Sequence, residues 1–416
     1  MLSWRKSPTI TLSSKKKKRM KVTIIYFALL LSFFSSCDKE SKSKNKITNY
    51  TIDLNDNTKW DLLEHIDSIA FIPLQSEEIF YPIPGRIRYN DKYIGYLIQE
   101  DPSNTELIIF DWEGNHINNF TTIYDSKDGL STINDFALYR DTVYILNDDK
   151  ISKYNIYDSK SPHNYYLDDI YTSFTRTIDG FILYNSTSPF LYQQITESGT
   201  RIADYISTAL IPDNYTDYFN HFSNIYDSND KFLFSNLSSQ LYKLDWDQNK
   251  VVKDHYINIQ DVIIDNETLT NLRMQGKEGS HKLENIILSG EHFFKYDNIM
   301  DLKEYRLYIT KLHGKIYYFI LNKINNSINT FSGVKNNTGF FFLHNSAGYL
   351  PIYGSVNMQH NDYILLLINS EDIHHYKDYL QDMKIGVKSN WEQMKNKVTD
   401  SYNPIMVLLK LKKFTN

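Results

Sequence analysis

The sequence has very little cysteine and no excess of one charge. A single cysteine among 416 residues excludes a disulfide within the chain and a zinc site made of several cysteines. The formal net charge is −5, and the strongest basic run, Lys15–Lys21, precedes the expected fold. We therefore expect no nucleic-acid partner.

Catalytic motifs that a short stretch of sequence would reveal are also missing. There is no Gly-x-Ser-x-Gly elbow, no phosphate-binding loop and no His-Glu-x-x-His. Asp245–Asn249 has calcium-like spacing without the glycine and the distal glutamate, so a polar hairpin turn is favoured. Asp148 and Asp149 are typical turn residues, and His374 and His375 would point apart on a helix. We expect no metal, no cofactor and no identifiable catalytic residue.

What is present is a strand-forming composition. Hydrophobic residues make up 41% of the chain and charged residues 23%, which is typical of a globular protein. Aromatic residues reach 15%, with 33 Tyr and 23 Phe, and this favours strands over helices. The same rings could line a sugar-stacking surface, although strands already need them for a core.

The N-terminus has the pattern of a secretory signal. Lys15–Lys21 is positively charged, Val22–Leu31 is apolar, and small residues precede Cys37. The apolar run is too short to span a membrane well, which disfavours the alternative of an uncleaved anchor helix. Translation could start at Met1 or at Met20, since Met20–Cys37 is a complete signal by itself.

Phe34-Ser35-Ser36-Cys37 resembles the lipobox of bacterial lipoproteins. The resemblance implies cleavage before Cys37 and lipidation of its thiol, with residues 1–37 removed or modified as the signal and the membrane as a partner. Residues 38–50 are then a flexible tether. Asp38-Lys39-Glu40 resembles a Gram-negative signal for the outer face of the outer membrane, so we expect outer-membrane attachment, with exposure at the surface left open.

A repeat of short strands and polar turns organises residues 51–416. Its clearest copy runs from Ile133 to Tyr157, where apolar stretches are cut by Tyr139–Asp141 and Asn147–Asp149. Six turns of this kind are found, near Asp91, Asp141, Asp179, Asp230, Gly314 and Asp362. The spacing predicts an all-β, six-bladed β-propeller, whose radial repetition leaves few open edges. A pair of β-sandwiches is the alternative.

Two helical additions to the propeller are expected. Residues 256–292 interrupt the repeat, with a short helix over Asp265–Met274, Asp265 as its N-cap, and a loop over Gly276–Ser280. A second helix begins at Ser370 and precedes the last strand. Trp60–His65 is expected to form one or two helical turns. We expect Ile69–Leu74 to close the ring beside Val407–Leu411.

Three stretches resemble the lipid-anchored six-bladed β-propellers (TolB-like in shape) of Gram-negative bacteria. Ile69–Leu74 is similar to the opening strand of that family, Ile109–Gly114 to its Phe-Asp-x-x-Gly hairpin, and Asn403–Lys412 to its closing strand. Thr122–Leu130 and Asn345–Gly348 depart from the family's Gly-Pro-Gly-Glu-like and acidic segments. These departures put in doubt any binding that those segments provide in relatives.

The resemblance implies no settled activity, although members are often associated with glycan or peptide uptake at the cell envelope. We expect a non-catalytic binding or scaffold lipoprotein that uses the central mouth or the insertion, with an unidentified ligand or envelope protein as its partner. The alternative is a propeller lyase or hydrolase whose residues converge at the central channel. A His, Asp and Arg cluster at the mouth would favour the enzyme, and an aromatic, charge-poor rim would favour binding.

Overall fold

The structure is a computed structural model, and the residues it describes belong to one compact unit, Ile47–Asn416. The described residues are 48–54, 58–75, 87–101, 104–122, 130, 132–147, 149–185, 188–208, 225–227, 231–234, 239–259, 262–293, 296–335, 352–358, 361–368, 388–389 and 403–412. Cys37, His374, His375 and the helix expected from Ser370 lie outside them, as do most of Thr122–Leu130 and all of Asn345–Gly348.

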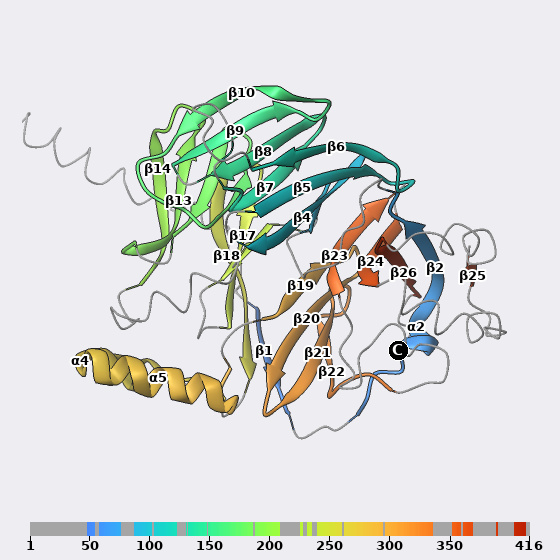
Figure 1. Ribbon diagram of the computed structural model, residues 1–416. Helices are drawn as coiled ribbons and strands as arrows, with labels where there is room; N and C mark the ends of the chain where they lie inside the picture. The colour runs from blue at the N-terminus through green and yellow to red at the C-terminus, as the bar shows by residue number, and fades with distance from the viewer. Residues whose placement is uncertain are drawn as a thin grey trace, which may run out of the picture. The chain divides into compact units, whose positions relative to one another are not determined.

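Six sheets follow one another along the chain and form the blades of a β-propeller, as the sequence predicts (Figure 1). The first blade contains β3 (Ile87–Tyr89), β4 (Tyr93–Asp101), β5 (Asn104–Asp111) and β6 (His116–Thr121). The second contains β7 (Asp135–Tyr139), β8 (Thr142–Asn147), β9 (Lys150–Asn155) and β10 (Asp158–Tyr166). The third contains β11 (Ser173–Arg176), β12 (Gly180–Tyr184), β13 (Phe190–Thr196) and β14 (Arg201–Ser207).

The other three blades include strands from distant parts of the chain. The fourth contains β15 (Ile225–Asp227), β16 (Lys231–Phe234), β17 (Gln240–Asp245) and β18 (Lys250–Ile259), with β1 (Thr48–Ile52) added in parallel. The fifth contains β19 (Asn298–Asp301), β20 (Tyr305–Leu312), β21 (Lys315–Asn322) and β22 (Ser327–Phe331). The sixth contains β23 (Ile352–Met358), β24 (Asn361–Ile368), β26 (Ile405–Leu411), β2 (Ile66–Pro73) and β25 (Lys388–Ser389).

The first strand of each blade contacts the first strand of the next, from β3 through β7, β11, β15 and β19 to β23. Four of the six predicted turns, near Asp91, Asp141, Asp179 and Asp362, lead from the first to the second strand of a blade. The fifth, near Asp230, falls outside the described residues. The sixth is out of phase, because Gly314 lies between β20 and β21, the second and third strands of the fifth blade. The four-residue strand β19, which directly follows the insertion, was not predicted as the start of that blade.

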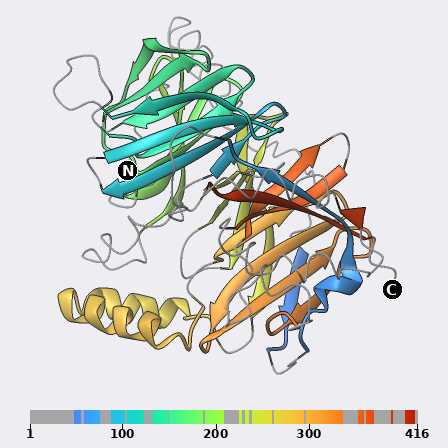
Figure 2. The ribbon, with the colours of Figure 1, turned by 45° about the vertical axis from the view of Figure 1, so that its right-hand side comes forward.

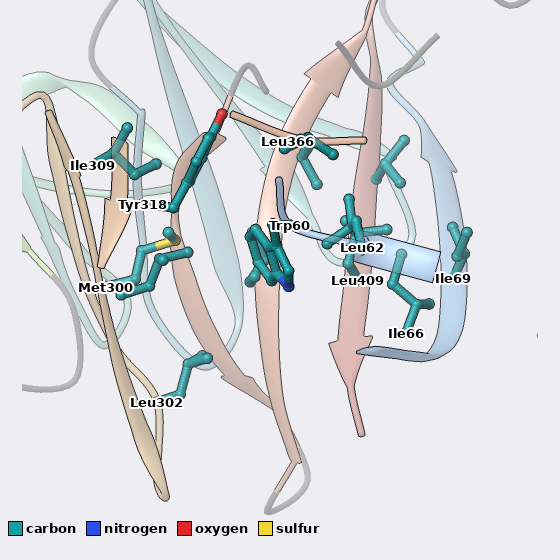
Figure 3. Close-up of a cluster of buried hydrophobic side chains, with 14 of the residues drawn as sticks. Trp60, Leu62, Ile66, Ile69, Met300, Leu302, Ile309, Tyr318, Leu366 and Leu409 are labelled. Atoms are coloured by element: carbon teal, nitrogen blue, oxygen red, sulfur yellow. The ribbon is translucent and has the colours of Figure 1, made fainter. Parts of the chain in front are cut away.

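Apolar side chains fill the junctions between blades because alternate residues of a strand point to opposite faces. On β20, Leu307 and Ile309 pack toward the sixth blade, while Tyr308 packs toward the fourth. Figure 3 shows the junction of the fifth and sixth blades, with Trp60 between Tyr318 and Leu366. Trp60 is fully buried there and precedes α2 (Leu62–His65), which confirms the expected helical turn.

The ring closes as predicted, because β2 pairs antiparallel with β26 in the sixth blade. The closure also reaches the first blade, where Gln75 N donates to Gly114 O at 2.8 Å. Gly114 has φ +86°, and a Cβ there would lie 2.2 Å from the Pro73 carbonyl oxygen, so glycine is required. Leu74 N donates to Pro404 O at 3.2 Å. The three stretches that carry the family resemblance therefore meet at the closure, and their role there is architectural.

The insertion folds as two helices, α4 (Asn266–Met274) and α5 (Lys277–Ser289), which lie side by side (Figure 2). The Asp265 side chain caps α4 by accepting from Thr268 N, as predicted. The prediction of a loop over Gly276–Ser280 is wrong, since α5 begins at Lys277. A Cβ on Gly279 would lie 1.7 Å from Leu272 O, so this glycine lets the two helices touch. Among the described residues, no helix is long and apolar enough to cross a membrane.

Candidate functional site

The sequence-based candidates occupy ordinary turns where the structure describes them. Asp245–Asn249 joins β17 to β18, and Asn249 adopts φ 47°, so the hairpin turn expected there is confirmed. Asp149 is exposed in the turn between β8 and β9. Among the described residues, no group of three His, Cys, Asp or Glu side chains is placed to hold a metal ion. Other residues converge instead. Buried Arg88 and Asp135 pair at 3.4 Å between the first and second blades, and two larger clusters lie at other blade junctions.

The first, the Asp254–Arg306 cluster, comprises Asp254, His255, Asp301, Arg306 and Tyr308. It lies at the junction of the fourth and fifth blades, because β18 and β20 turn these side chains toward each other. The Arg306 guanidinium donates to Asp301 through Nε and to Asp254 through Nη1, both at 2.5 Å. His255 Nδ1 lies 2.6 Å from Asp254 Oδ2, and the Tyr308 hydroxyl bonds His255 Nε2.

Electrostatics fix the protonation states in this cluster. Burial lowers the pKa of His255 below its ordinary 6.5, and the bond to Asp254 opposes this only in part. Burial by itself would raise the pKa of Asp254, but the His255 bond and the Arg306 charge together hold it well below its usual range. Burial raises the pKa of Tyr308. The imidazole is therefore neutral at pH 7, donating from Nδ1 to Asp254 and accepting the Tyr308 hydroxyl at Nε2.

The Asp254–Arg306 cluster contains the His, Asp and Arg set that would favour an enzyme, but it lies between two blades. The side chains of His255, Asp301 and Arg306 are only 6%, 6% and 7% exposed, respectively. Lys243 reaches Asp254 at 3.6 Å and Lys323 reaches Asp301 at 3.0 Å, so both carboxylates are bonded on several sides. These polar groups bind one another, so the cluster links the fourth blade to the fifth through buried ion pairs and hydrogen bonds.

The second, the Tyr139–Arg176 cluster, lies between the second and third blades and combines cations with aromatic rings. Its members are Tyr139, Arg140, Tyr144, Lys153, Arg176, Phe181 and Glu197. The Arg176 guanidinium is 5.2 Å from the Phe181 ring centroid, 5.4 Å from that of Tyr144 and 6.0 Å from that of Tyr139. Arg140 stands 5.4 Å from the Tyr139 centroid, and Lys153 Nζ is 5.8 Å from that of Tyr144. All are within cation–π range.

The sheet register explains the Tyr139–Arg176 cluster. Tyr144 pairs with Lys153 across β8 and β9, so both side chains face the third blade. Arg176, at the end of β11, pairs with Phe181 and is held by Glu197 and by the Gly180 carbonyl oxygen, each at 2.5 Å. Tyr139 and Arg140 reach the same place from the turn between β7 and β8. Tyr139 is 47% exposed, so this cluster opens to solvent.

Sequence reasoning missed both clusters, because their members come from different blades. No single stretch places Arg176 beside Tyr139 or Arg306 beside Asp254, and only the strand pairing brings them together. The aromatic excess was the one available signal. It is largely accounted for by the blade junctions, where Tyr184, Tyr192 and Phe136 are fully buried.

No protein-family model matches the sequence, and no curated protein matches it. Among solved structures, the chain is similar to a candidate exported protein from Bacteroides fragilis, with 14% identity and a TM-score of 0.63 over 88% of this chain and 99% of that one. The likeness is one of fold. The extracellular domain of a candidate one-component system from B. thetaiotaomicron is also similar, at 9% identity and a TM-score of 0.33 over 70% of this chain and 39% of that one.

Proposed function

We propose that this chain is a cell-envelope lipoprotein whose propeller binds a ligand without catalysing a reaction. The observation that carries the proposal is the Tyr139–Arg176 cluster, where the exposed Tyr139 ring meets cations at a blade junction. Sites that bind ligands combine apolar and aromatic surface with a few placed polar groups, and this cluster has both. A glycan or a peptide of the envelope is the ligand class that the family resemblance implies.

The lipid anchor at Cys37 is the second part of the proposal. The lipobox-like Phe34–Cys37 and the acidic Asp38-Lys39-Glu40 support attachment to the outer membrane, with outer-face exposure as its extension. The similar B. fragilis protein is itself a candidate exported protein. With more than one acyl chain at the mature N-terminus, attachment would be stable.

The anchor is tested by expressing the full chain in a Gram-negative host and following incorporation of labelled palmitate. We expect label in the parent and in an outer-membrane fraction, and none in Cys37→Ser. Label in Cys37→Ser, or a parent found in the soluble fraction, would contradict the anchor. Protease treatment of whole cells then distinguishes the two faces of the membrane.

Binding is tested by thermal unfolding of the detergent-solubilised chain against glycans, peptides and divalent metal salts. A ligand that binds only the folded state stabilises it by about 2.7 kcal/mol at a hundredfold excess over its Kd. We expect a shift with one ligand class that is lost in Tyr139→Ala with Arg140→Ala. Shifts that persist in this double variant would place the site elsewhere, and no shift with any compound would contradict a small-molecule ligand.

An enzyme is the second candidate, and the bonds from Asp254 through His255 to Tyr308 favour it. A carboxylate that orients a neutral imidazole is the arrangement of a general base. The test is turnover of the ligand that binds: product formation that is abolished in His255→Gln, while binding persists, would replace the non-catalytic proposal.

A further inference from the structure

We propose that the ligand of the Tyr139–Arg176 cluster carries a negative charge, and that it is an acidic saccharide. The proposal rests on the binding function proposed above and specifies its chemistry. It also assigns the cations on the third-blade side of the turn between β7 and β8 to the acid group of the ligand. Asp141 and Tyr157, on the first-blade side, are assigned to its hydroxyls.

The balance of charge in the cluster is the first argument. Three cations, Arg140, Lys153 and Arg176, surround the rings, and Glu197 pairs with one of them, Arg176. Among the residues that the structure describes, neither Arg140 nor Lys153 has a carboxylate partner. Positive charge gathered over low-dielectric aromatic surface attracts an anion.

The positioning of the two arginines is the second argument. Arg176 is fixed by Glu197 and the Gly180 carbonyl, its side chain is 12% exposed, and its Nε is buried with no hydrogen-bond partner among the described residues. Arg140 has φ 54° because it lies in the two-residue turn between β7 and β8, and its side chain is exposed there. A planar guanidinium matches the geometry of a carboxylate, as the Arg176–Glu197 pair shows, and the exposed Arg140 can present the same group to an acid group of the ligand.

Hydroxyl-binding groups next to the cations are the third argument. Asp141 follows Arg140 in the same turn and accepts from the Tyr93 hydroxyl at 3.1 Å, while the Tyr93 and Tyr157 hydroxyls are 2.5 Å apart. Tyr157 is 64% exposed. A phenol can donate to a sugar hydroxyl or accept from one, whereas the Asp141 carboxylate can only accept. Tyr157 contacts Tyr93 of the first blade, on the other side of the turn from Tyr139 and Arg176, so these groups would meet the hydroxyls of a neighbouring sugar unit in an oligosaccharide.

The test compares two probes by calorimetry with the full chain in detergent: an oligogalacturonate and the neutral galactose oligomer of the same linkage and length. We expect the acidic oligomer to bind at least about tenfold more tightly, as one charge-assisted hydrogen bond would give. Arg140→Gln with Lys153→Gln should remove this preference and leave binding of the neutral oligomer unchanged. Arg201→Gln, an exposed arginine paired with Asp204 on β14, is the matched control and should change neither.

The possible outcomes test the charge of the ligand separately from the proposed binding function. Equal affinity for the two oligomers, with both lost in Tyr139→Ala, would overturn the acidic ligand and leave the binding function standing. Binding of neither oligomer, while another glycan or a peptide shifts thermal unfolding, would also overturn it. If single-stranded DNA bound as tightly as the oligogalacturonate, and 200 mM salt abolished both, the cluster would be a general polyanion surface and not a saccharide site.

Discussion

Two junctions of this propeller each hold an arginine at their centre, and they use it in opposite ways. Between the fourth and fifth blades, Arg306 is bonded to two buried carboxylates, which lysines reach as well. Between the second and third blades, Arg176 has one half-exposed carboxylate and three aromatic rings, and the two further cations pair with no carboxylate among the residues that the structure describes. Balanced, buried charge holds two blades together, whereas unbalanced charge that opens to solvent is where we propose that a ligand binds.

Replacing the two arginines should give the largest difference between the junctions. Arg306→Met leaves Asp254 and Asp301 buried without their shared cation, and we expect a loss of about 3–5 kcal/mol of unfolding free energy. Arg176→Met frees Glu197, which is 40% exposed and can be hydrated, so about 1–2 kcal/mol should be lost. Guanidinium chloride unfolding followed by tryptophan fluorescence measures both. Equal losses would contradict the distinction between the junctions.

Acid should weaken the fourth-to-fifth junction next. His255 has a folded-state pKa below 6.5 and Asp254 one below 3.8, so the unfolded chain binds more protons in both windows. The contribution of these two groups to the free energy of unfolding is therefore fully present above pH 6.5. As the pH falls it is lost first through protonation of His255, by up to about 1.4 kcal/mol per pH unit, and then through protonation of Asp254. The unfolding midpoint measured from pH 7.5 to 4 should fall.

His255→Gln isolates the imidazole in that experiment. The variant keeps a donor toward Asp254 and cannot be protonated, so its midpoint should fall less than that of the parent between pH 6.5 and 5. Parallel curves for parent and variant over this range would show that His255 does not control the acid response.

The smallest effects concern paired lysines. Lys92 reaches Asp141 at 3.0 Å with both side chains about half exposed, so Lys92→Met should leave the unfolding midpoint unchanged. Lys323 reaches the buried Asp301 at the same distance and is 28% exposed, and Lys323→Met should cost about 1 kcal/mol. A larger effect at Lys92 would show that exposed turn pairs hold the blades more firmly than buried ones.

The fold was predictable from the sequence because its information is local. Asn and Asp at turns between strands of β-branched and aromatic residues mark each blade, and the pairing of Ile69–Leu74 with Val407–Leu411 followed from their closing positions. The outer strands β6 and β10 were missed, because they are polar and largely exposed and show no alternation. The start of the fifth blade was missed for another reason: β19 is buried but only four residues long, too short to show a strand pattern.

The candidate site was not predictable, because its chemistry depends on contacts across blades. Arg176 and Tyr139 lie 37 positions apart, and His255 and Tyr308 lie 53 apart. Nothing in either neighbourhood distinguishes these residues from other strand residues. Sheet register and blade packing decide which of them meet, and neither can be derived from turn chemistry alone.

The closure by β2 imposes an order on folding. The sixth blade needs Ile66–Pro73 and Ile405–Leu411, so its sheet cannot be completed until the chain has been synthesised as far as Leu411. Until then β2 is an exposed apolar strand, because its partner β26 lies more than 300 residues later in the sequence and has not been synthesised. A chain truncated shortly before β26 would keep five blades and lose the strand that binds both ends together. We expect such a fragment to aggregate.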